Sequence, residues 1–277
     1  MRFQQITAHL MNQVRVNSIQ RQIRDGLPVY VKTRRFGRSF VVWCGNRFLF
    51  LAKSGLQMFV HTNEWTQWEL HCVQLLYPDC AVPIIHPAGT VVMPEVRGVS
   101  LRAMLHADKL EPKVAKAAAR EIRRVHQIQC PIYGGAWSHG DLHLDNVLYD
   151  SEKNQATVID FDTRHNVGLD EIRRHADDLK VFLLELVSKS PSRWKEIAFC
   201  VLQEYEDTEV LRELSRQLVV PRSIARILWY TRTSNCAISL IEPRLQCLRE
   251  MIHQVAHTAH TTQQSNIDDD DGLGNQL

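Results

Sequence analysis

Three polar side chains near the middle of the chain have types and a spacing suited to phosphoryl transfer. Asp141 lies five positions before Asn146, and Asp160 follows after an apolar run and a turn. Transfer of a phosphoryl group to a hydroxyl needs a carboxylate near the attacking oxygen and oxygen ligands for the magnesium ions that bridge the nucleotide phosphates. Asp141 suits the first task, and Asn146 and Asp160 suit the second.

The segments between these residues predict a β-hairpin that brings the carboxylates together. Residues 147–149 form one short strand and residues 156–159 form its partner. The Asp, Ser and Asn residues of segment 150–155 are typical of the connecting turn. Because the ends of a hairpin lie close in space, we expect Asp141 and Asp160 to meet at one end of it.

The two motifs also resemble those of a known superfamily. The string H-G-D-L-H-x-x-N followed by I-D-F-D is similar to the catalytic loop and metal-binding loop of protein-kinase-like phosphotransferases, written H-R-D-x-x-x-x-N and D-F-G. Gly140, His143 and Asp162 depart from ordinary eukaryotic-type protein kinases. In motif style they resemble the RIO-type, aminoglycoside-phosphotransferase and bacterial lipopolysaccharide-sugar kinase branches.

The resemblance implies ATP and Mg²⁺ as cofactors and a division of tasks within the motifs. The aspartate of the first motif would orient the acceptor hydroxyl and take its proton, with one histidine supporting the loop and the other near the acceptor. The implied catalytic residues are Asp141, His139 and His143, and the implied metal ligands are Asn146, Asp160 and Asp162.

The resemblance further implies an α+β fold with two lobes, a small β-rich N-lobe with a helix and a larger, mainly helical C-lobe. A chain of 277 residues with 44% hydrophobic content is large enough for one such unit. We expect the N-lobe over residues 1–97 and the C-lobe over residues 98–257. A disordered tail is expected over residues 258–277, which are polar and lack apolar periodicity.

Two other interpretations of the central stretch stay open. His139, Asp141, His143 and Asp145 alternate with other residues and are of types that suit zinc, although no cysteine or second histidine cluster lies nearby in the sequence. A purely structural hairpin would explain the apolar residues but not three polar residues at motif spacing.

Two lysines compete for the role of phosphate ligand. Lys32 ends the β-type run V-Y-V-K, which resembles the V-A-I-K strand of kinases, although no G-x-G-x-x-G motif precedes it. Lys53 ends a second strand-like run, residues 48–52, and lies sixteen positions before Glu69. We favour Lys32 and retain Lys53; a lysine after a strand is otherwise an exposed surface charge.

The partner of that lysine is expected on a helix over residues 63–77. Trp65, Trp68 and Cys72 lie on one face of this amphipathic segment. Glu69 lies one position from that stripe and is our candidate for the glutamate that fixes the lysine. The alternative is an ordinary exposed acid on a helix.

The string T-V-V-M-P-E-V-R-G-V-S-L resembles the passage from the last N-lobe strand through the hinge of kinase-like enzymes. By this resemblance, the backbone of Met93, Glu95 and Val96 would contact the adenine edge. Gly98 would let the chain turn, and Leu101 would begin a helix of the second lobe.

Hydrophobic periodicity predicts the other helices. We expect one or two amphipathic helices over residues 1–24, and further helices over 112–128, 170–187, 192–205, 222–231 and 243–257. In the kinase-like family a buried aspartate on the helix equivalent to 170–187 can hold the catalytic loop. Asp177 or Asp178 could do so, but two adjacent acids are more often a solvated edge.

Composition favours a cytoplasmic protein. The seven cysteines are scattered without a C-x-x-C pair, which predicts free thiols in a reducing compartment. The first residues lack the apolar core of a secretory signal, and no run of ~18 apolar residues occurs. The net charge of +2 excludes little.

The charge is distributed unevenly. Before Glu64 the only acidic residue is Asp25, whereas ten residues are basic. Such a segment attracts anions, either substrate phosphates or an anionic membrane. Apolar runs at 40–43 and 48–51 interleave with the basic residues, so we expect peripheral contact with the inner face of a membrane. The alternative is that these runs are strands facing their own core, and nucleic acid is not favoured as a partner.

Taken together, these features predict an ATP- and Mg²⁺-dependent phosphotransferase that moves the γ-phosphate to an acceptor hydroxyl. A lipopolysaccharide-type sugar or a similar non-protein acceptor is favoured, and an atypical, RIO-like protein serine/threonine kinase is the alternative. From a different class, the missing glycine loop leaves open a pseudokinase that binds nucleotide or a partner without turnover. The intact set of Asp141, Asn146 and Asp160 argues against a pseudokinase.

Overall fold

The computed structural model divides into two compact units. It describes residues 16–35, 37–80, 84–86, 89–190, 192–233 and 236–271, without the side chains of 85–86 and 259–271. The N-terminal unit ends at Arg97 and also includes Asp160–Asn166. The C-terminal unit contains Gly98–Ile159 and the chain from Val167 onward.

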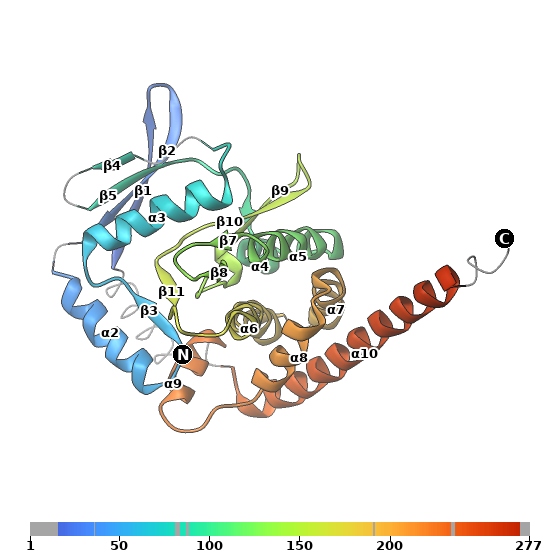
Figure 1. Cartoon of the computed structure of the whole chain (residues 1–277). Coiled ribbons are helices and arrows are strands. Elements are labelled where there is room, and N and C mark those ends of the chain that lie inside the picture. The colour runs from blue at the N-terminus through green and yellow to red at the C-terminus, as the bar shows by residue number, and fades with distance from the viewer. Residues whose placement is uncertain are drawn as a thin grey trace. The chain divides into compact units, whose positions relative to one another are not determined.

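A four-stranded antiparallel sheet forms the N-terminal unit, in the order β1-β2-β5-β4 (Figure 1). Its strands are β1 (Asn17–Arg24), β2 (Leu27–Arg34), β4 (Ile84–His86) and β5 (Thr90–Pro94). Asp25 and Gly26 connect β1 to β2 with φ values of 51° and 77°. Positive φ at both positions is typical of a type I′ hairpin turn, for which Asp-Gly is a favoured pair.

The helix expected up to residue 24 is wrong for its described part, because residues 17–24 form β1. Ile19 and Ile23 are four positions apart, a spacing that fits one face of a helix and also one face of a strand. Pairing with β2 along the whole of β1 decides between them. Residues 1–15, which carry the rest of that prediction, lie outside the described residues.

The run 48–52, expected as a strand, is helical instead. It belongs to α2 (Ser39–Leu51), which precedes the short strand β3 (Leu56–Met58) and α3 (Thr62–Leu76). The Asn46 side chain donates to the Met58 carbonyl at 2.8 Å and accepts from the Met58 N–H at 2.8 Å. These bonds fix α2 against β3, so tertiary contacts outweigh the β-propensity of the apolar run.

One segment distant in sequence completes the N-terminal unit. The strand β11 (Thr163–His165) pairs antiparallel with β3, and the Asn166 N–H donates to the Gly55 carbonyl at 2.8 Å. The expected domains placed this segment in the C-lobe. Its pairing with β3 instead makes Asp160 and Asp162 part of the N-terminal unit.

The C-terminal unit is mainly helical. Its helices are α4 (Leu101–His106), α5 (Pro112–His126), α6 (Glu171–Lys189), α7 (Trp194–Tyr205), α8 (Thr208–Gln217), α9 (Ala225–Arg232) and α10 (Ile238–Asp271). α6 packs against α7, α8, α9 and α10 (Figure 1). Of its 19 residues, 13 are buried. A helix buried on nearly all sides is the core of its unit.

Five strands accompany these helices. β6 (Val99–Ser100), β9 (Val147–Asp150) and β10 (Gln155–Val158) form one sheet, and β7 (Gln129–Cys130) pairs with β8 (Gly135–Ala136). The predicted hairpin is confirmed, since Val147 pairs with Val158 and Asp150 with Gln155. A 3₁₀ turn, Leu144–Asn146, leads into β9.

The predicted α+β fold, with a small β-rich N-terminal part and a larger helical C-terminal part, is confirmed. Two helical features differ from the prediction: α8 was not expected, and α10 continues to Asp271 through much of the expected disordered tail. No glycine or proline interrupts residues 244–271, and each residue added to an existing helix adds one hydrogen bond. Residues 272–277 lie outside the description, and none of the described helices is long and apolar enough to cross a membrane.

Gly98 generates a stability prediction. Its φ is 138°, and a Cβ at this position would lie 3.0 Å from both the carbonyl carbon and oxygen of Tyr149. Gly98→Ala should lower the free energy of unfolding by about 1–3 kcal/mol, because strain and close contact act together. Urea unfolding followed by circular dichroism measures the change. Gly168→Ala is the control, since nothing lies within 4 Å of a Cβ there; equal midpoints for the two variants would contradict the prediction.

Candidate active site

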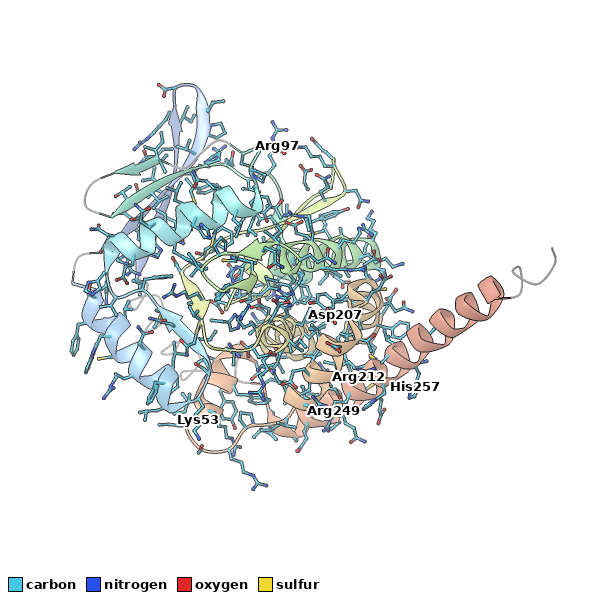
Figure 2. The ribbon with its side chains drawn as sticks, viewed as in Figure 1. Lys53, Arg97, Asp207, Arg212, Arg249 and His257 are labelled. Atoms are coloured by element: carbon cyan, nitrogen blue, oxygen red, sulfur yellow. The ribbon has the colours of Figure 1, made fainter. Side chains whose placement is uncertain are left out.

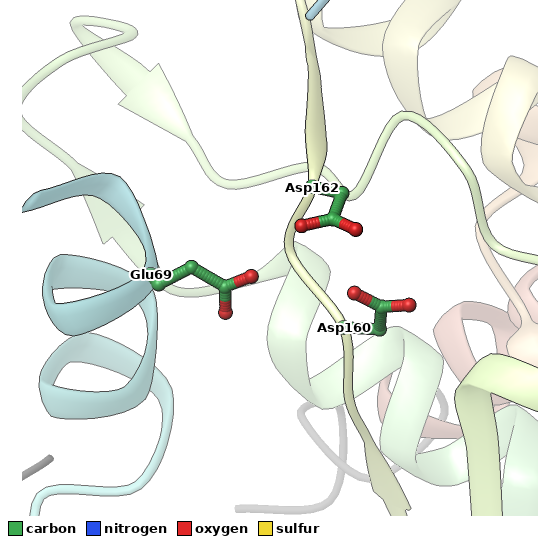
Figure 3. A group of neighbouring side chains, drawn as sticks. All are labelled: Glu69, Asp160 and Asp162. Atoms are coloured by element: carbon green, nitrogen blue, oxygen red, sulfur yellow. The ribbon is translucent and has the colours of Figure 1, made fainter. Parts of the chain in front are cut away.

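Lys32 lies among three carboxylates of the N-terminal unit. Its side chain is only 1% exposed, and its Nζ contacts Glu69, Asp160 and Asp162, the last at 2.7 Å. Ligand oxygens of the three acids all lie within 4.8 Å of one another, and Figure 3 shows the acids converging from α3 and from the segment after β10. Residues separated by more than a hundred positions in sequence thus form one cluster, which we call the lysine cluster.

The local structure explains why these side chains point inward. Lys32 lies in β2 directly opposite Val91 of β5, in the interior of the sheet. On α3, Trp65, Glu69 and Cys72 recur at spacings of four and three, so the helical period places the glutamate on the buried face. Glu69 is completely buried. The alternative of an ordinary exposed acid is therefore wrong.

Lys53 does not belong to the lysine cluster. It lies directly after α2 with a φ of 50°, and its side chain is exposed (Figure 2). The run that precedes it is a helix rather than a strand. The structure therefore supports Lys32 over Lys53 as the candidate phosphate ligand.

Three acids surround one ammonium group, so the cluster holds an excess of negative charge. Burial raises the pKa of Glu69 to about 8, with Lys32 offsetting part of the effect and Asp162 and Asp160 adding to it. For Lys32, burial alone would lower the pKa, but the three carboxylates raise it well above its usual value. For Asp162, burial alone would raise the pKa, but Lys32 and the Trp65 indole hold it below its usual value.

Asp162 is held in place by donors that the sequence analysis did not identify. Its Oδ1 accepts from Asn17 Nδ2 and from Trp65 Nε1, both at 2.8 Å, in addition to its contact with Lys32. Arg34 supports this arrangement, because its Nε donates to Asn17 Oδ1 at 3.3 Å and its guanidinium lies 5.1 Å from the Trp65 ring. Three donors on one oxygen hold Asp162 in a fixed orientation.

The lysine cluster fits a magnesium ion. The side chains of Asp160 and Asp162 are 32% and 36% exposed, so solvent reaches them, whereas Lys32 and Glu69 are buried. Carboxylate oxygens are ligands that Mg²⁺ prefers. Asp160 also adopts a left-handed φ of 69°, a conformation uncommon for residues other than glycine and frequent at functional sites.

In the C-terminal unit, Asp178 of α6 holds the loop 139–146, which we call the catalytic loop. Asp178 Oδ2 accepts from the His139 N–H at 2.7 Å, and Oδ1 accepts from the Gly140 N–H at 2.8 Å. Asp178 is completely buried, and its neighbour Asp177 pairs with Arg232 at 3.1 Å. The interpretation of the two acids as a solvated edge is therefore wrong.

Glu185 holds the other end of the catalytic loop and was missed by the sequence analysis. It accepts from the Leu144 N–H at 2.8 Å and pairs with Arg102 and Lys189 at 2.5 and 2.7 Å. Its spacing of seven from Asp178 places both acids on one face of α6, which is the sequence signal that could have identified it.

The histidines of the catalytic loop have different surroundings. His139 Nδ1 accepts from the Asp141 N–H at 3.2 Å, and its Nε2 lies 3.0 Å from the Ile159 carbonyl. With these two contacts, His139 links the catalytic loop to the segment that ends at Ile159. His143 Nε2 lies 3.7 Å from Asp141 Oδ2, beside the carboxylate that would act on the acceptor.

Asn146 connects the catalytic loop to the segment that precedes Asp160. Its Nδ2 donates to the Asp141 carbonyl at 2.9 Å, and its own carbonyl accepts from the Ile159 N–H at 2.9 Å. The side-chain oxygen is the atom that a metal would use. The Asp141 side chain is 46% exposed, as a group that acts on an acceptor requires.

The zinc alternative does not fit the structure. Among the described residues, the only set of three or more acidic, histidine or cysteine side chains with converging ligand atoms is the lysine cluster. His139, Asp141, His143 and Asp145 do not converge in this way, and His139 uses both ring nitrogens within the fold.

The expected adenine contacts fall on the end of β5 and on the segment after it. The Glu95 N–H donates to the Pro28 carbonyl at 3.1 Å, and its carboxylate pairs with Arg21 at 2.6 Å. The bond to Arg21 holds the pKa of Glu95 below its usual value. The N–H of Glu95 is thus engaged within the fold, and the adenine contacts of the backbone of Met93, Glu95 and Val96 stay a prediction.

Comparisons with known proteins do not assign the chain to a family. No family model and no curated protein matches the sequence. Among solved structures, an ethanolamine kinase from Plasmodium vivax is similar to this chain with a TM-score of 0.46 and 12% identity, covering 94% of this chain and 86% of that one. Similarity at this level carries no functional argument. The functional argument therefore depends on the geometry of the lysine cluster and of the catalytic loop.

The raised pKa of Glu69 predicts a pH dependence of stability. The folded state keeps a proton on Glu69 up to about pH 8, whereas the unfolded state loses it near 4.5. Stability should therefore fall as pH rises between these values, and Glu69→Gln should remove that part of the slope. Urea unfolding without metal, at several pH values between 4.5 and 8, measures this pH dependence of the free energy of unfolding. Glu64→Gln, an exposed acid on the same helix, should keep the wild-type slope; identical slopes for wild type and Glu69→Gln would contradict the assignment.

Asp178 generates a second prediction about stability. Asp178→Ala leaves two buried N–H groups of the catalytic loop without their acceptor, and each such group costs about 1–3 kcal/mol. Asp170→Ala, at the N-cap of the same helix, removes one bond to the Arg173 N–H and should cost about 1 kcal/mol. Urea unfolding compares the two variants. Equal losses would show that Asp178 does not hold the loop.

Proposed function

We propose that this protein is an ATP- and Mg²⁺-dependent phosphotransferase that moves the γ-phosphate to an acceptor hydroxyl. The observation that carries the proposal is the lysine cluster, in which a buried cation, Lys32, lies beside two solvent-accessible carboxylates, Asp160 and Asp162. A fixed ammonium group and oxygen ligands for a metal ion can together position a nucleoside triphosphate.

The chain's own residues would share the work as follows. Bound ATP would supply the phosphoryl group and leave as ADP, and Mg²⁺ would neutralise part of the charge on the phosphates. Asp160, Asp162 and Asn146 would hold the metal. Lys32 would hold the phosphate oxygens, and Glu69 would keep the lysine in position through their buried contact. In a loose transition state, such positioning and charge neutralisation supply most of the rate enhancement.

Asp141 would act on the acceptor. Its exposed carboxylate would orient the acceptor hydroxyl and take its proton as the new bond to phosphorus forms. Asp178 and Glu185 would hold the backbone of the catalytic loop still during this step. His143 would lie near the acceptor, and His139 would support the loop.

A lipopolysaccharide-type sugar or a similar non-protein molecule is the acceptor class we favour. Support comes from the motif H-G-D-L-H-x-x-N, whose style resembles kinases of such acceptors. Phosphorylation of a protein hydroxyl, as by an atypical RIO-like kinase, is the alternative within the same chemistry. A panel containing sugars, small amino alcohols and protein substrates distinguishes them.

A nucleotide- or partner-binding module without turnover is the second candidate function. One observation favours it: Lys32 is 1% exposed and its ammonium group already contacts three carboxylates. The turn between β1 and β2 is also a two-residue Asp-Gly hairpin rather than a glycine-rich loop.

Phosphotransfer from γ-labelled ATP tests the proposal. Wild type should label at least one acceptor class in a Mg²⁺-dependent reaction. Asp141→Asn should lower kcat by about 10²–10⁴-fold, the range for loss of a general base, while nucleotide affinity is retained. Lys32→Ala should lose nucleotide affinity as well, and Lys53→Ala is its matched control with wild-type activity.

The opposite results separate the two candidate functions. Mg²⁺-dependent nucleotide binding without transfer to any acceptor class, the protein itself included, would establish the binding module. Full activity in Asp141→Asn would show that this residue does not act on the acceptor.

A further inference from the structure

The helix α2 carries apolar side chains on two faces, and only one of these faces is buried. Val42 and Leu49 form the buried face, and the Asn46 side chain on the same face bonds to both backbone groups of Met58 in β3. The two elements α2 and β3 lie side by side (Figure 1). Gly45 approaches β3 so closely that a side chain there would overlap Met58. This face is fully used within the N-terminal unit.

The other face is exposed. Phe40, Trp43, Phe50 and Leu51 are 70%, 51%, 75% and 62% exposed, and the rings of Phe40 and Trp43 stack at 6.0 Å. Positions 40, 43, 47 and 50 recur at spacings of three and four, so these residues form one stripe on the helix. We call this stripe, together with Leu51, the aromatic face. Single exposed apolar residues are ordinary, but several large apolar side chains exposed on one helix face mark an interaction site.

The surroundings of the aromatic face are basic. Between Asp25 and Glu64 the sequence contains no acidic residue. Arg35, Arg47 and Lys53 are exposed, and the Arg47 guanidinium lies 5.9 Å from the Trp43 ring, within the face itself. An apolar stripe bordered by cationic side chains is complementary to a surface that is anionic outside and apolar beneath.

We propose that the aromatic face of α2 docks on an anionic lipid bilayer. The helix would lie in the plane of the interface, with the rings of Phe40, Trp43 and Phe50 at the boundary between headgroups and acyl chains. Arg47 and Lys53 would pair with anionic headgroups, each with an electrostatic attraction that salt screens. This inference does not depend on catalysis and would hold for a binding module as well.

Co-sedimentation of the full chain with vesicles tests the proposal. The vesicles consist of phosphatidylcholine alone or of phosphatidylcholine mixed with phosphatidylglycerol. Wild type should bind the mixed vesicles and not the neutral ones. Phe40→Ala combined with Phe50→Ala should weaken binding about tenfold or more, because burial of each aromatic ring contributes that order of affinity.

Matched variants keep the experiment interpretable. Val219→Ala combined with Ile227→Ala removes two side chains of the C-terminal unit that are 52% and 55% exposed, and it should bind like wild type. Arg47→Gln combined with Lys53→Gln should weaken binding and reduce its dependence on salt. Circular dichroism confirms that each variant is folded.

Three results would overturn the proposal. The first is equal binding to neutral and anionic vesicles, and the second is unchanged binding by the double phenylalanine variant. The third is a wild-type dimer in size-exclusion chromatography that this variant converts to a monomer, without binding of wild type to lipid. That result would assign the aromatic face to contact with a second copy of the chain.

Discussion

Burial of the Lys32 ammonium group constrains the whole N-terminal unit. A buried charge is tolerated only where opposite charges and hydrogen bonds surround it. The sheet supplies the lysine, α3 supplies Glu69, and the segment 160–166 supplies Asp160 and Asp162. The pairing of β11 with β3 keeps that segment in place. The long-range arrangement of the unit therefore serves a single charged site.

The C-terminal unit uses buried acids for a different purpose. In α6, Asp178 and Glu185 accept hydrogen bonds from the backbone of the catalytic loop. A network beneath the loop supports them: His126 Nδ1 lies 2.8 Å from the Tyr205 hydroxyl, and its Nε2 lies 3.2 Å from Asp178. Burial lowers the pKa of His175, stacked on His126 at 4.0 Å, to about 2, so this ring stays neutral. A loop held this firmly can present Asp141 in a fixed orientation.

Local patterns predicted the elements whose period is unambiguous. The amphipathic period of residues 63–77 and 112–128 led to α3 and α5, and the hairpin after Asn146 followed from its turn residues. The predictions failed where the pattern fits two structures. Ile19 and Ile23 suit a helix or a strand, and the apolar run before Lys53 suits a strand or a helix. In both cases the neighbouring element decided: β2 pairs with β1, and β3 is bonded to α2.

The sequence by itself determined which residue types could perform the chemistry: Asp141, Asn146 and Asp160 at motif spacing, with a lysine and a glutamate upstream. Only the tertiary structure distinguished the two candidate lysines. Both end apolar runs, but Lys32 is buried in a strand among three acids, whereas Lys53 is exposed after a helix. The tertiary structure also revealed the roles of Asn17, Trp65 and Glu185. The physical reason is that burial and charge pairing depend on contacts across the fold, which spacing along the chain does not specify.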